Sequence, residues 1–155
     1  MKKVFLICVI LISGCSARGP IFNGVQLQDE SSSTVYLFRQ SAFVNSAYCP
    51  VIQVDNRDIG CLKNGGFMRL EIGVGEHNLR VRKRLLEVGG EPEVTINGKK
   101  GEVLFYEWTS QLNHMSMIGS IVSASVSEGI IKHNESTATQ ILGSLRENRH
   151  KYNKK

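Results

Sequence analysis

The sequence lacks the residue patterns that mark the common enzyme classes. It has no Gly-x-Ser-x-Gly turn around a nucleophilic serine, no phosphate-binding loop and no glycine fingerprint for a dinucleotide. Its four histidines occur at no metal-ligand spacing such as His-x-x-x-His. These absences favour a protein that is not an enzyme and that uses no cofactor and no metal.

The sequence also lacks an apolar run long enough to cross a membrane as a helix. Its longest run, residues 4–12, is about half of the roughly 20 residues that a spanning helix needs. Lys2 and Lys3 precede this run, and small residues follow it up to Cys15. A charged start, a short apolar stretch and small residues at the end are typical of a secretory signal. We therefore predict a signal peptide over residues 1–14, cleaved between Gly14 and Cys15.

The run Ile12-Ser13-Gly14-Cys15 resembles the lipobox of bacterial lipoproteins. The resemblance implies that Cys15 carries a lipid, and that its chains anchor the protein, since each buried methylene contributes about 0.8 kcal/mol. Ser16 follows the cysteine, where an aspartate tends to retain Gram-negative lipoproteins in the inner membrane. We therefore expect a lipid-anchored protein of the cell envelope, at the outer membrane and facing the periplasm.

Strong positive charge is absent as well. The formal charge of +5 falls to +3 when Lys2 and Lys3 leave with the signal, which is too little to indicate a nucleic-acid partner. Arg80, Arg82 and Arg84 alternate along one strand face and form a candidate anion-binding site for an envelope polymer or lipid phosphate. The alternative is a solvated face, or a sheet edge that charge protects from aggregation.

Cysteines are few, and only two of the four belong to the mature domain. Cys8 leaves with the signal and Cys15 carries the lipid, which leaves Cys49 and Cys61 in a compartment that permits disulfides. A simple hairpin with its turn at Asn56 would hold these two cysteines about 10–13 Å apart. A disulfide, two separate buried thiols and a reactive thiol therefore all remain open.

The middle of the sequence consists of short β-like segments separated by turn residues. Alternating or apolar runs occupy residues 34–39, 51–54, 59–62, 67–72, 76–84, 93–96, 101–108 and 129–132. Regular short strands with Gly- and Asn-rich turns predict a mainly β fold, a small antiparallel sandwich or an open barrel. Residues 112–127 are apolar and Ser-rich without clear periodicity, and fit a strand, a loop or a short helix.

The two ends of the mature chain differ from this pattern. Residues 15–33 contain Gly, Pro and a run of serines, which predicts a lipidated tether, although Phe22 and Val25 are apolar enough to pack. Apolar residues at helical spacing predict one C-terminal helix over residues 135–148, capped by Asn134 and covering a sheet. The β-rich domain thus extends over residues 34–149, and a basic tail over residues 150–155.

Several of these motifs together resemble a family of small bacterial lipoproteins that carry a domain of unknown function. The matching residues are Val35-Tyr36-Leu37-Phe38-Arg39, Val54-Asp55-Asn56-Arg57-Asp58-Ile59-Gly60, Leu62, Asn64-Gly65-Gly66-Phe67, Gly75-Glu76-His77-Asn78-Leu79 and Phe105-Tyr106. The resemblance implies a β-sandwich in the cell envelope and implies no enzymatic reaction. Gly73-Val74-Gly75 departs from the family, which has Pro-Gly there.

His77 is the one histidine within a family motif. It could act with Glu76 as a metal ligand or a base, but adjacent residues on a strand point to opposite faces. A histidine that fixes a turn by bonding to the backbone is therefore the favoured interpretation. We expect a non-enzymatic role in binding or envelope structure. An accessory subunit of a surface or secretion assembly is the alternative, which an exposed apolar patch over residues 115–126 would favour, and a periplasmic enzyme is a further one.

Overall fold

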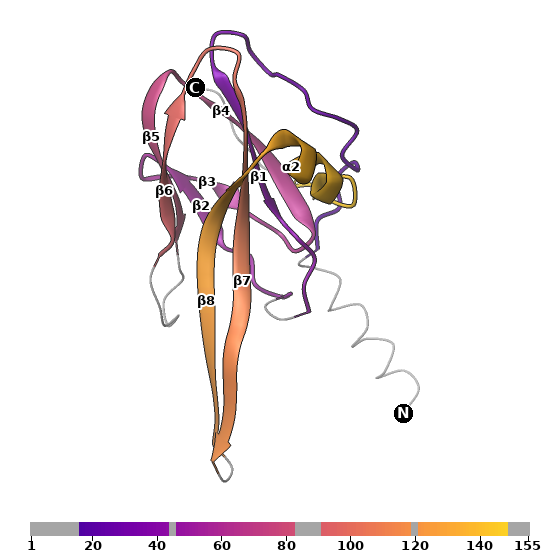
Figure 1. Ribbon diagram of the computed structural model, residues 1–155, viewed down its shortest axis with the longest axis vertical. Helices are drawn as coiled ribbons and strands as arrows, with labels where there is room; N and C mark the ends of the chain where they lie inside the picture. The colour runs from indigo at the N-terminus through magenta and orange to yellow at the C-terminus, as the bar shows by residue number, and fades with distance from the viewer. Residues whose placement is uncertain (1–15, 44–45, 83–90, 119–120, 149–155) are drawn as a thin grey trace.

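The computed structural model describes residues 16–43, 46–82, 91–118 and 121–148, and the side chains of these residues except for 112–126. The signal peptide, Cys15 and the basic tail lie outside the described residues. The elements in chain order are β1 (Ser33–Arg39), β2 (Val51–Val54), β3 (Arg57–Cys61), β4 (Gly66–Ile72), β5 (Gly75–Arg82), β6 (Glu93–Gly98), β7 (Val103–Ile118), β8 (Ile121–His133), α2 (Glu135–Leu142) and β9 (Arg146–Glu147) (Figure 1). Each predicted strand overlaps one of these strands.

The strands form two sheets, which confirms the prediction of a mainly β sandwich with a helix near its C-terminal end. One sheet has the order β8-β7-β1-β4-β9, and the other has the order β3-β2-β5-β6. The sandwich is not purely antiparallel, because β1 pairs with β7, and β4 with β9, in parallel. Two parallel strands need a long connection between them. The connection from β1 to β7 includes the strands of the four-stranded sheet.

The core between the sheets is made by alternate residues of the strands. In β4, Met68 and Ile72 are buried toward this core, while the intervening Arg69 and Glu71 are not. In β5, Leu79 and Val81 are fully buried in the same core. The predicted alternation of both strands is therefore confirmed, because one face of each strand meets the opposite sheet.

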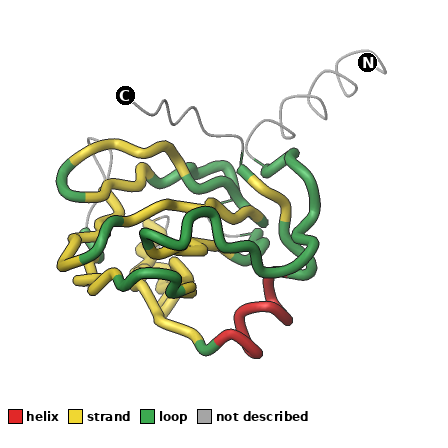
Figure 2. The backbone as a smooth tube through the Cα atoms, turned by 90° about the horizontal axis from the view of Figure 1, so that it is seen from above, coloured by secondary structure: helices red, strands yellow, loops and turns green. Residues whose placement is uncertain are grey.

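The outer face of the five-stranded sheet is covered too. Its aromatic side chains are buried together with residues of the C-terminal region, in a cluster of Tyr36, Phe38, Phe67, Phe105, Ala138, Leu142 and Leu145. Helix α2 lies outside the strands in the view from above (Figure 2). Strand β1 is consequently buried on both faces over its whole length. This second apolar layer explains why the chain has aromatic residues at outward positions of its central strands.

The segment before β1 completes this outer layer. The ring of Phe22 packs edge-on against Tyr36 at 5.9 Å and Phe67 at 5.8 Å between ring centroids. The amides of Ala17, Gly19 and Phe22 donate to the carbonyls of residues 64, 147 and 145. Residues 16–32 are therefore part of the folded domain and not the predicted tether, because their few apolar side chains cover aromatic surface that would otherwise meet water.

The C-terminal helix begins as predicted and ends earlier. The Asn134 side chain accepts a hydrogen bond from the amide of Thr137 at 2.9 Å, which confirms the expected cap. The helix ends at Leu142 and not near residue 148. Beyond it, Arg146 and Glu147 form β9 and pair with the start of β4. In the sequence, the helical spacing continues to Leu145 although this residue lies in the turn after the helix. The reason is that Leu145 packs in the same apolar cluster as Ala138 and Leu142.

Strands β7 and β8 are longer than the rest of the sandwich. Strand β7 pairs with β1 from Val103 to Glu107 only, whereas its pairing with β8 continues to Ile118 and Ile121. The described part of the ambiguous segment, residues 112–118 and 121–127, therefore consists of strands, which form a two-stranded ribbon that extends away from the two sheets (Figure 1). No helix within the described part of the chain is long and apolar enough to cross a membrane.

Candidate functional site

Cys49 and Cys61 form a disulfide, with Cα atoms 5.4 Å apart. The hairpin turn is centred on Asp55 and Asn56, both with positive φ, so that Val51 lies opposite Cys61. The expected separation of 10–13 Å is wrong because the turn begins one residue earlier than assumed, which by itself would move the partner of Cys61 two residues closer to Cys49, from Ile52 to Pro50. A register shift between Ile52 and Gln53 returns this partner by one residue, to Val51.

His77 bonds to a carboxylate of the neighbouring hairpin. Its Nδ1 lies 2.7 Å from Oδ2 of Asp55, and Oδ1 of Asp55 accepts the amide of Asn78 at 2.9 Å. The bond from His77 is the largest of the causes that hold the pKa of Asp55 below its usual 3.8, so the carboxylate is ionised at neutral pH. An ionised carboxylate only accepts, so Nδ1 is the donor. The pair fixes the β2–β3 turn to the start of β5.

The alternative interpretation, a partnership of His77 with Glu76, is not present. Glu76 is exposed and Nε2 of His77 is buried, without a hydrogen-bond partner among the described residues. The histidine does fix a turn, as favoured, but through Asp55 instead of a backbone group. Within the described ranges, no three His, Cys, Asp or Glu residues are grouped closely enough to hold a metal ion.

The predicted anion-binding strip is largely occupied by carboxylates. Arg80 forms an ion pair with Glu93 of the adjacent strand at 2.9 Å, and Arg82 forms one with Asp58 at 2.8 Å. Arg84 lies outside the described residues. Because both described guanidinium groups already have a carboxylate partner, this face does not present the open cationic site that the sequence suggests. The alternative of a solvated strand face describes it better, and the alternative of a protected sheet edge does not apply, because β5 lies between β2 and β6.

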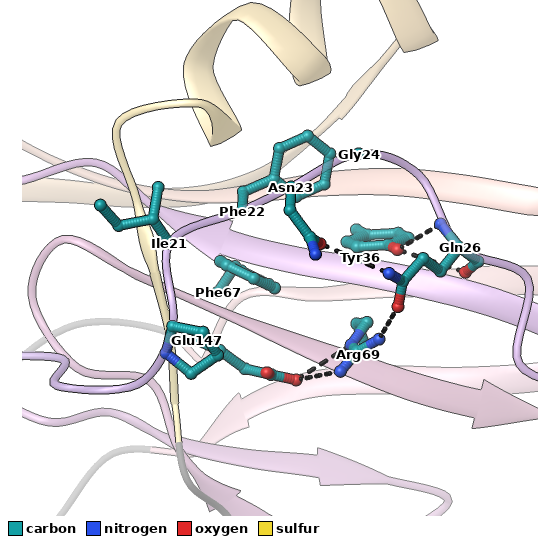
Figure 3. Close-up of a pocket in the computed structure, with 10 residues that line it drawn as sticks. Ile21, Phe22, Asn23, Gly24, Gln26, Tyr36, Phe67, Arg69 and Glu147 are labelled. Atoms are coloured by element: carbon teal, nitrogen blue, oxygen red, sulfur yellow. Dashed lines mark hydrogen bonds and ion pairs between the residues drawn. The ribbon is translucent and has the colours of Figure 1, made fainter.

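A small pocket lies where the N-terminal segment crosses the outer face of the five-stranded sheet (Figure 3). It has a volume of about 110 Å³ between Phe22, Tyr36 and Phe67. Arg69 closes one side, donating to Glu147 at 2.7 and 2.9 Å and to the Gln26 side chain at 2.6 Å. These polar groups join the segment, β4 and β9 to each other. The pocket is smaller than the roughly 300 Å³ at which small-molecule sites begin.

A buried polar group at the base of the ribbon was not predicted from the sequence. Glu107 of β7 is 5% exposed, its Oε2 lies 2.8 Å from Nε2 of His133 on β8, and its Oε1 accepts from Gln40 at 2.8 Å. Beside it, the guanidinium of Arg39 lies 4.7 Å from the ring centre of Trp108 and donates to the carbonyl of Tyr48. A single glutamate within the hydrophobic run of residues 103–108 is the only sequence signal for this group.

Glu107, Arg39 and the side chains around them lie at the end of the five-stranded sheet at which the N-terminal segment enters. Ser16 forms a bridge with Asn64, and the amide of Ala17 donates to the Asn64 carbonyl at 3.2 Å. The Asn64 side chain in turn makes two hydrogen bonds of 3.0 Å with the backbone of Ala42. The ribbon leaves the sheet from this same end, because Arg39 at the end of β1 pairs with Gly66, and Phe38 beside it pairs with Glu107.

The glycines after Asn64 permit this arrangement. Gly65 has a φ of 64°, a conformation that side chains disfavour. A Cβ on Gly66 would collide with the side chains of Asn148 and Ala17. The motif Asn64-Gly65-Gly66 therefore forms the seat that receives the first described residues of the chain. Lipidation was predicted for the residue immediately before them, so this end of the sheet is the candidate functional site.

Comparison with protein families gives one match. A family described as a protein of unknown function, DUF2846, matches residues 29–120. The chain belongs to this family. The match extends from the residues before β1 to the end of β7, and it includes every motif on which the resemblance was based, whereas helix α2 and residues 16–28 lie outside it. No curated protein and no solved structure matches the chain.

Proposed function

We propose that this protein is a lipoprotein of the cell envelope, anchored through Cys15, with a non-enzymatic role in binding or in envelope structure. The observation that carries the proposal is the sequence of the first 15 residues. A charged start, a nine-residue apolar run and Ile12-Ser13-Gly14-Cys15 follow each other without interruption.

Two features of the folded domain support the proposal. The disulfide between Cys49 and Cys61 belongs to an oxidising compartment, which an exported domain reaches and a cytosolic one does not. The seat around Asn64 holds Ser16 against the sheet, so that a lipid on Cys15 would connect directly to a fixed point of the domain. The anchor would then position the sandwich at the membrane surface instead of leaving it attached through a flexible linker.

The non-enzymatic part of the proposal is supported by the geometry of the described residues. The described pockets have volumes of about 110 and 150 Å³ and open to solvent. Of the two histidine–carboxylate pairs, His77 with Asp55 joins β5 to the β2–β3 turn and His133 with Glu107 joins β8 to β7, and the pairs lie in different sheets. A general acid–base site would need such groups to converge on one pocket of substrate size.

Metabolic labelling with palmitate tests the anchor. We expect the wild type to incorporate label and to fractionate with membranes, and the Cys15→Ala variant to lose both properties. Cys8→Ala is the matched control, because Cys8 lies in the predicted signal and should leave with it. Wild-type protein without label, together with Cys15→Ala protein that still fractionates with membranes, would contradict the proposal.

The choice of membrane can be tested at Ser16. In a Gram-negative host, Ser16→Asp should move the protein from outer-membrane to inner-membrane fractions, because aspartate after the lipidated cysteine tends to retain lipoproteins there. The Ser16 side chain is exposed, so the substitution should leave the fold unchanged. Equal distribution of the wild type and the variant would contradict an outer-membrane location that depends on this residue.

A further inference from the structure

The β7–β8 ribbon has two open edges beyond the sheet. After Glu107, the only described partner of β7 is β8, and β8 is itself the outermost strand of its sheet. A two-stranded ribbon is marginally stable in water without a third strand or a covered face. The ribbon nevertheless continues for ten residues, from Thr109 to Ile118, or about 33 Å at the rise of a strand.

The register sorts the residues of the ribbon by polarity. On the face that continues the inner core of the sandwich, the paired positions beyond Glu128 are Leu112–Val126, Met115–Ala124 and Met117–Val122. On the opposite face they are Gln111–Ser127, His114–Ser125 and Ser116–Ser123, with Ile118–Ile121 at the end. One face is thus occupied by apolar residue types alone, and the other by polar types up to its last pair.

A register shift produces this separation. The pairing shifts between Leu112 and His114, which leaves Asn113 as an extra residue. With strict alternation, Met115 would share a face with Asn113 and fall opposite to Leu112. The shift instead places Met115 and Met117 with Leu112. This arrangement also explains why the sequence of residues 112–127 has no clear period, although the ribbon has two distinct faces.

Beyond the Ser110–Glu128 pair, the ribbon is also free of formal charge. Residues 109–127 contain no Lys, Arg, Asp or Glu, whereas 21% of the whole chain is charged. A solvated strand face, or an edge that must avoid other proteins, is normally rich in charge, as β5 is. The absence of charge suits an environment in which a charged side chain would be costly, and lipid is one such environment.

The position of the anchor identifies the environment. Ser16 is held by Asn64 at the end of the sheet from which the ribbon leaves. Cys15 is the next residue, one Cα–Cα step of about 3.8 Å away. An acylated Cys15 would therefore bring that end of the sheet to the headgroups. A ribbon that extends about 33 Å from the same end must then meet the lipid.

We propose that the distal β7–β8 ribbon lies in the interface of the membrane that holds Cys15, with its apolar face toward the acyl chains. The inference rests on the lipid anchor proposed above. The ribbon lies along the interface and does not cross the hydrocarbon, because its open edges need water or headgroups as hydrogen-bond partners. It is the strand counterpart of an amphipathic interfacial helix, and with the anchor it provides a second membrane contact.

Site-specific fluorescence in the lipidated full-length protein tests this inference. Cys49 and Cys61 are joined in the disulfide and Cys15 is acylated, so an introduced cysteine is the only free thiol of the mature chain. A polarity-sensitive dye is attached at Met117→Cys or Ser116→Cys, and the protein is reconstituted into phosphatidylethanolamine–phosphatidylglycerol vesicles that contain nitroxide-labelled lipids. Thr95→Cys, at an exposed position of β6, serves as the remote control.

We expect strong quenching by the nitroxide lipids at position 117, weaker quenching at 116 and none at 95. Equal quenching at 117 and 95, in protein that floats with the vesicles, would overturn the inference and leave the anchor intact. The inference would also be overturned if position 117 were protected from aqueous iodide but not quenched by lipid, and the protein had twice the mass of one chain. A second copy of the chain would then cover the apolar face. Protein that neither floats nor incorporates palmitate would overturn the anchor and, with it, this inference.

A matched pair of substitutions separates contact with lipid from a simple effect of folding. Val122 and Ser123 are neighbours on β8 and occupy opposite faces of the ribbon. With the dye at Met117→Cys, Val122→Asp should abolish the lipid quenching, whereas Ser123→Asp should leave most of it. Loss of quenching in both variants, or in neither, would contradict a specific role of the apolar face. The same variants retain the disulfide, which can be checked by mass.

Discussion

Asp55 shows how one charged side chain connects two hairpins. It occupies a positive-φ position in the β2–β3 turn, where aspartate and asparagine are tolerated, and its carboxylate bonds to the ring of His77 and the amide of Asn78. The family motif around residues 54–60 and the motif around residues 75–79 are thus joined at this point. Their occurrence together in the sequence has a structural reason, and no catalytic one is needed.

The pKa of Asp55 leads to a prediction about pH. Because the folded protein holds this pKa below 3.8, the carboxylate contributes stability above pH 3.8 and loses it as the pH falls through the lower folded value. Asp55→Asn, which still tolerates positive φ, should cost about 0.5 kcal/mol at pH 7, since the side chain is half exposed. Its deficit relative to wild type should shrink as the pH falls from 3.8 toward 2. Urea unfolding at both pH values measures it.

The exposed neighbour Glu76 provides the control for this experiment. Glu76→Gln should change the unfolding free energy by less than Asp55→Asn at pH 7. An Asp55→Asn deficit that stays the same from pH 7 to pH 2 would show that the lost contribution does not come from the charge.

The disulfide gives a second prediction at this scale. It closes a loop with a sequence separation of 12 residues, and the loop-entropy model assigns such a crosslink about 3 kcal/mol. Cys49→Ser combined with Cys61→Ser should therefore lower the unfolding free energy by about that amount, and dithiothreitol should destabilise the wild type alone. If the reductant has no effect on the unfolding of the wild type, the bond is not present in solution.

At the scale of elements, the main feature is the second apolar layer. The segment of residues 16–28 and helix α2 cover the aromatic face of the five-stranded sheet, and β9 pairs at its edge. Neither the segment nor the helix could be stable alone, because eight helical residues are too few in water and the segment has no regular structure. Each depends on the rings of Tyr36, Phe67 and Phe105, and the rings depend on them to be buried.

Hydrogen exchange distinguishes this docked segment from a tether. The amides of Ala17, Gly19 and Phe22 donate to carbonyls of the body, so we expect them to exchange slowly and nearly in step with β1. Phe22→Ala should accelerate all three, because it removes the ring that packs on Tyr36 and Phe67. Fast exchange of these amides in the wild type would restore the tether interpretation. Mass spectrometry of peptic peptides reports the difference.

At the scale of the whole molecule, the protein is a sandwich with an extended ribbon at the same end as Ser16, next to the proposed anchor. The inner core lies between the sheets and the aromatic layer outside one of them, and no ribbon residue with a described side chain beyond Trp108 and Ile130 belongs to either cluster. The buried group around Glu107 fixes the base of the ribbon to the sheet through Gln40 and His133. Folding of the body and extension of the ribbon are therefore separable.

Truncation of the ribbon tests that separation. Replacement of residues 110–128 by an Asn-Gly turn should leave the unfolding free energy of the domain within about 1 kcal/mol of wild type, because an uncovered two-stranded hairpin adds little stability in water. Circular dichroism and urea unfolding in the absence of lipid provide the measurement. A truncated protein that fails to fold would mean that the distal ribbon belongs to the core of the sandwich.

Much of this architecture follows from local patterns in the sequence. The alternation of residues 67–72 and 76–82 fixes which face of β4 and β5 is buried, because the side-chain period of a strand is two. Asn134 fixes the start of the helix through its cap. The first 15 residues predict the anchor without any fold at all, since signal recognition depends on a linear pattern of charge, apolar length and small residues.

Only the tertiary structure decided which distant residues meet. The disulfide depended on the exact position of the β2–β3 turn, because moving the turn by one residue changes the pairing of Cys61 by two residues, and neither this position nor the register shift beyond it could be read from spacing. The arginines of β5 became ion pairs because β6 and β3 place carboxylates beside them. The first described residues became part of the sandwich because Asn64, Gly65 and Gly66 form a seat for them, and a seat exists only when segments far apart in sequence are packed together.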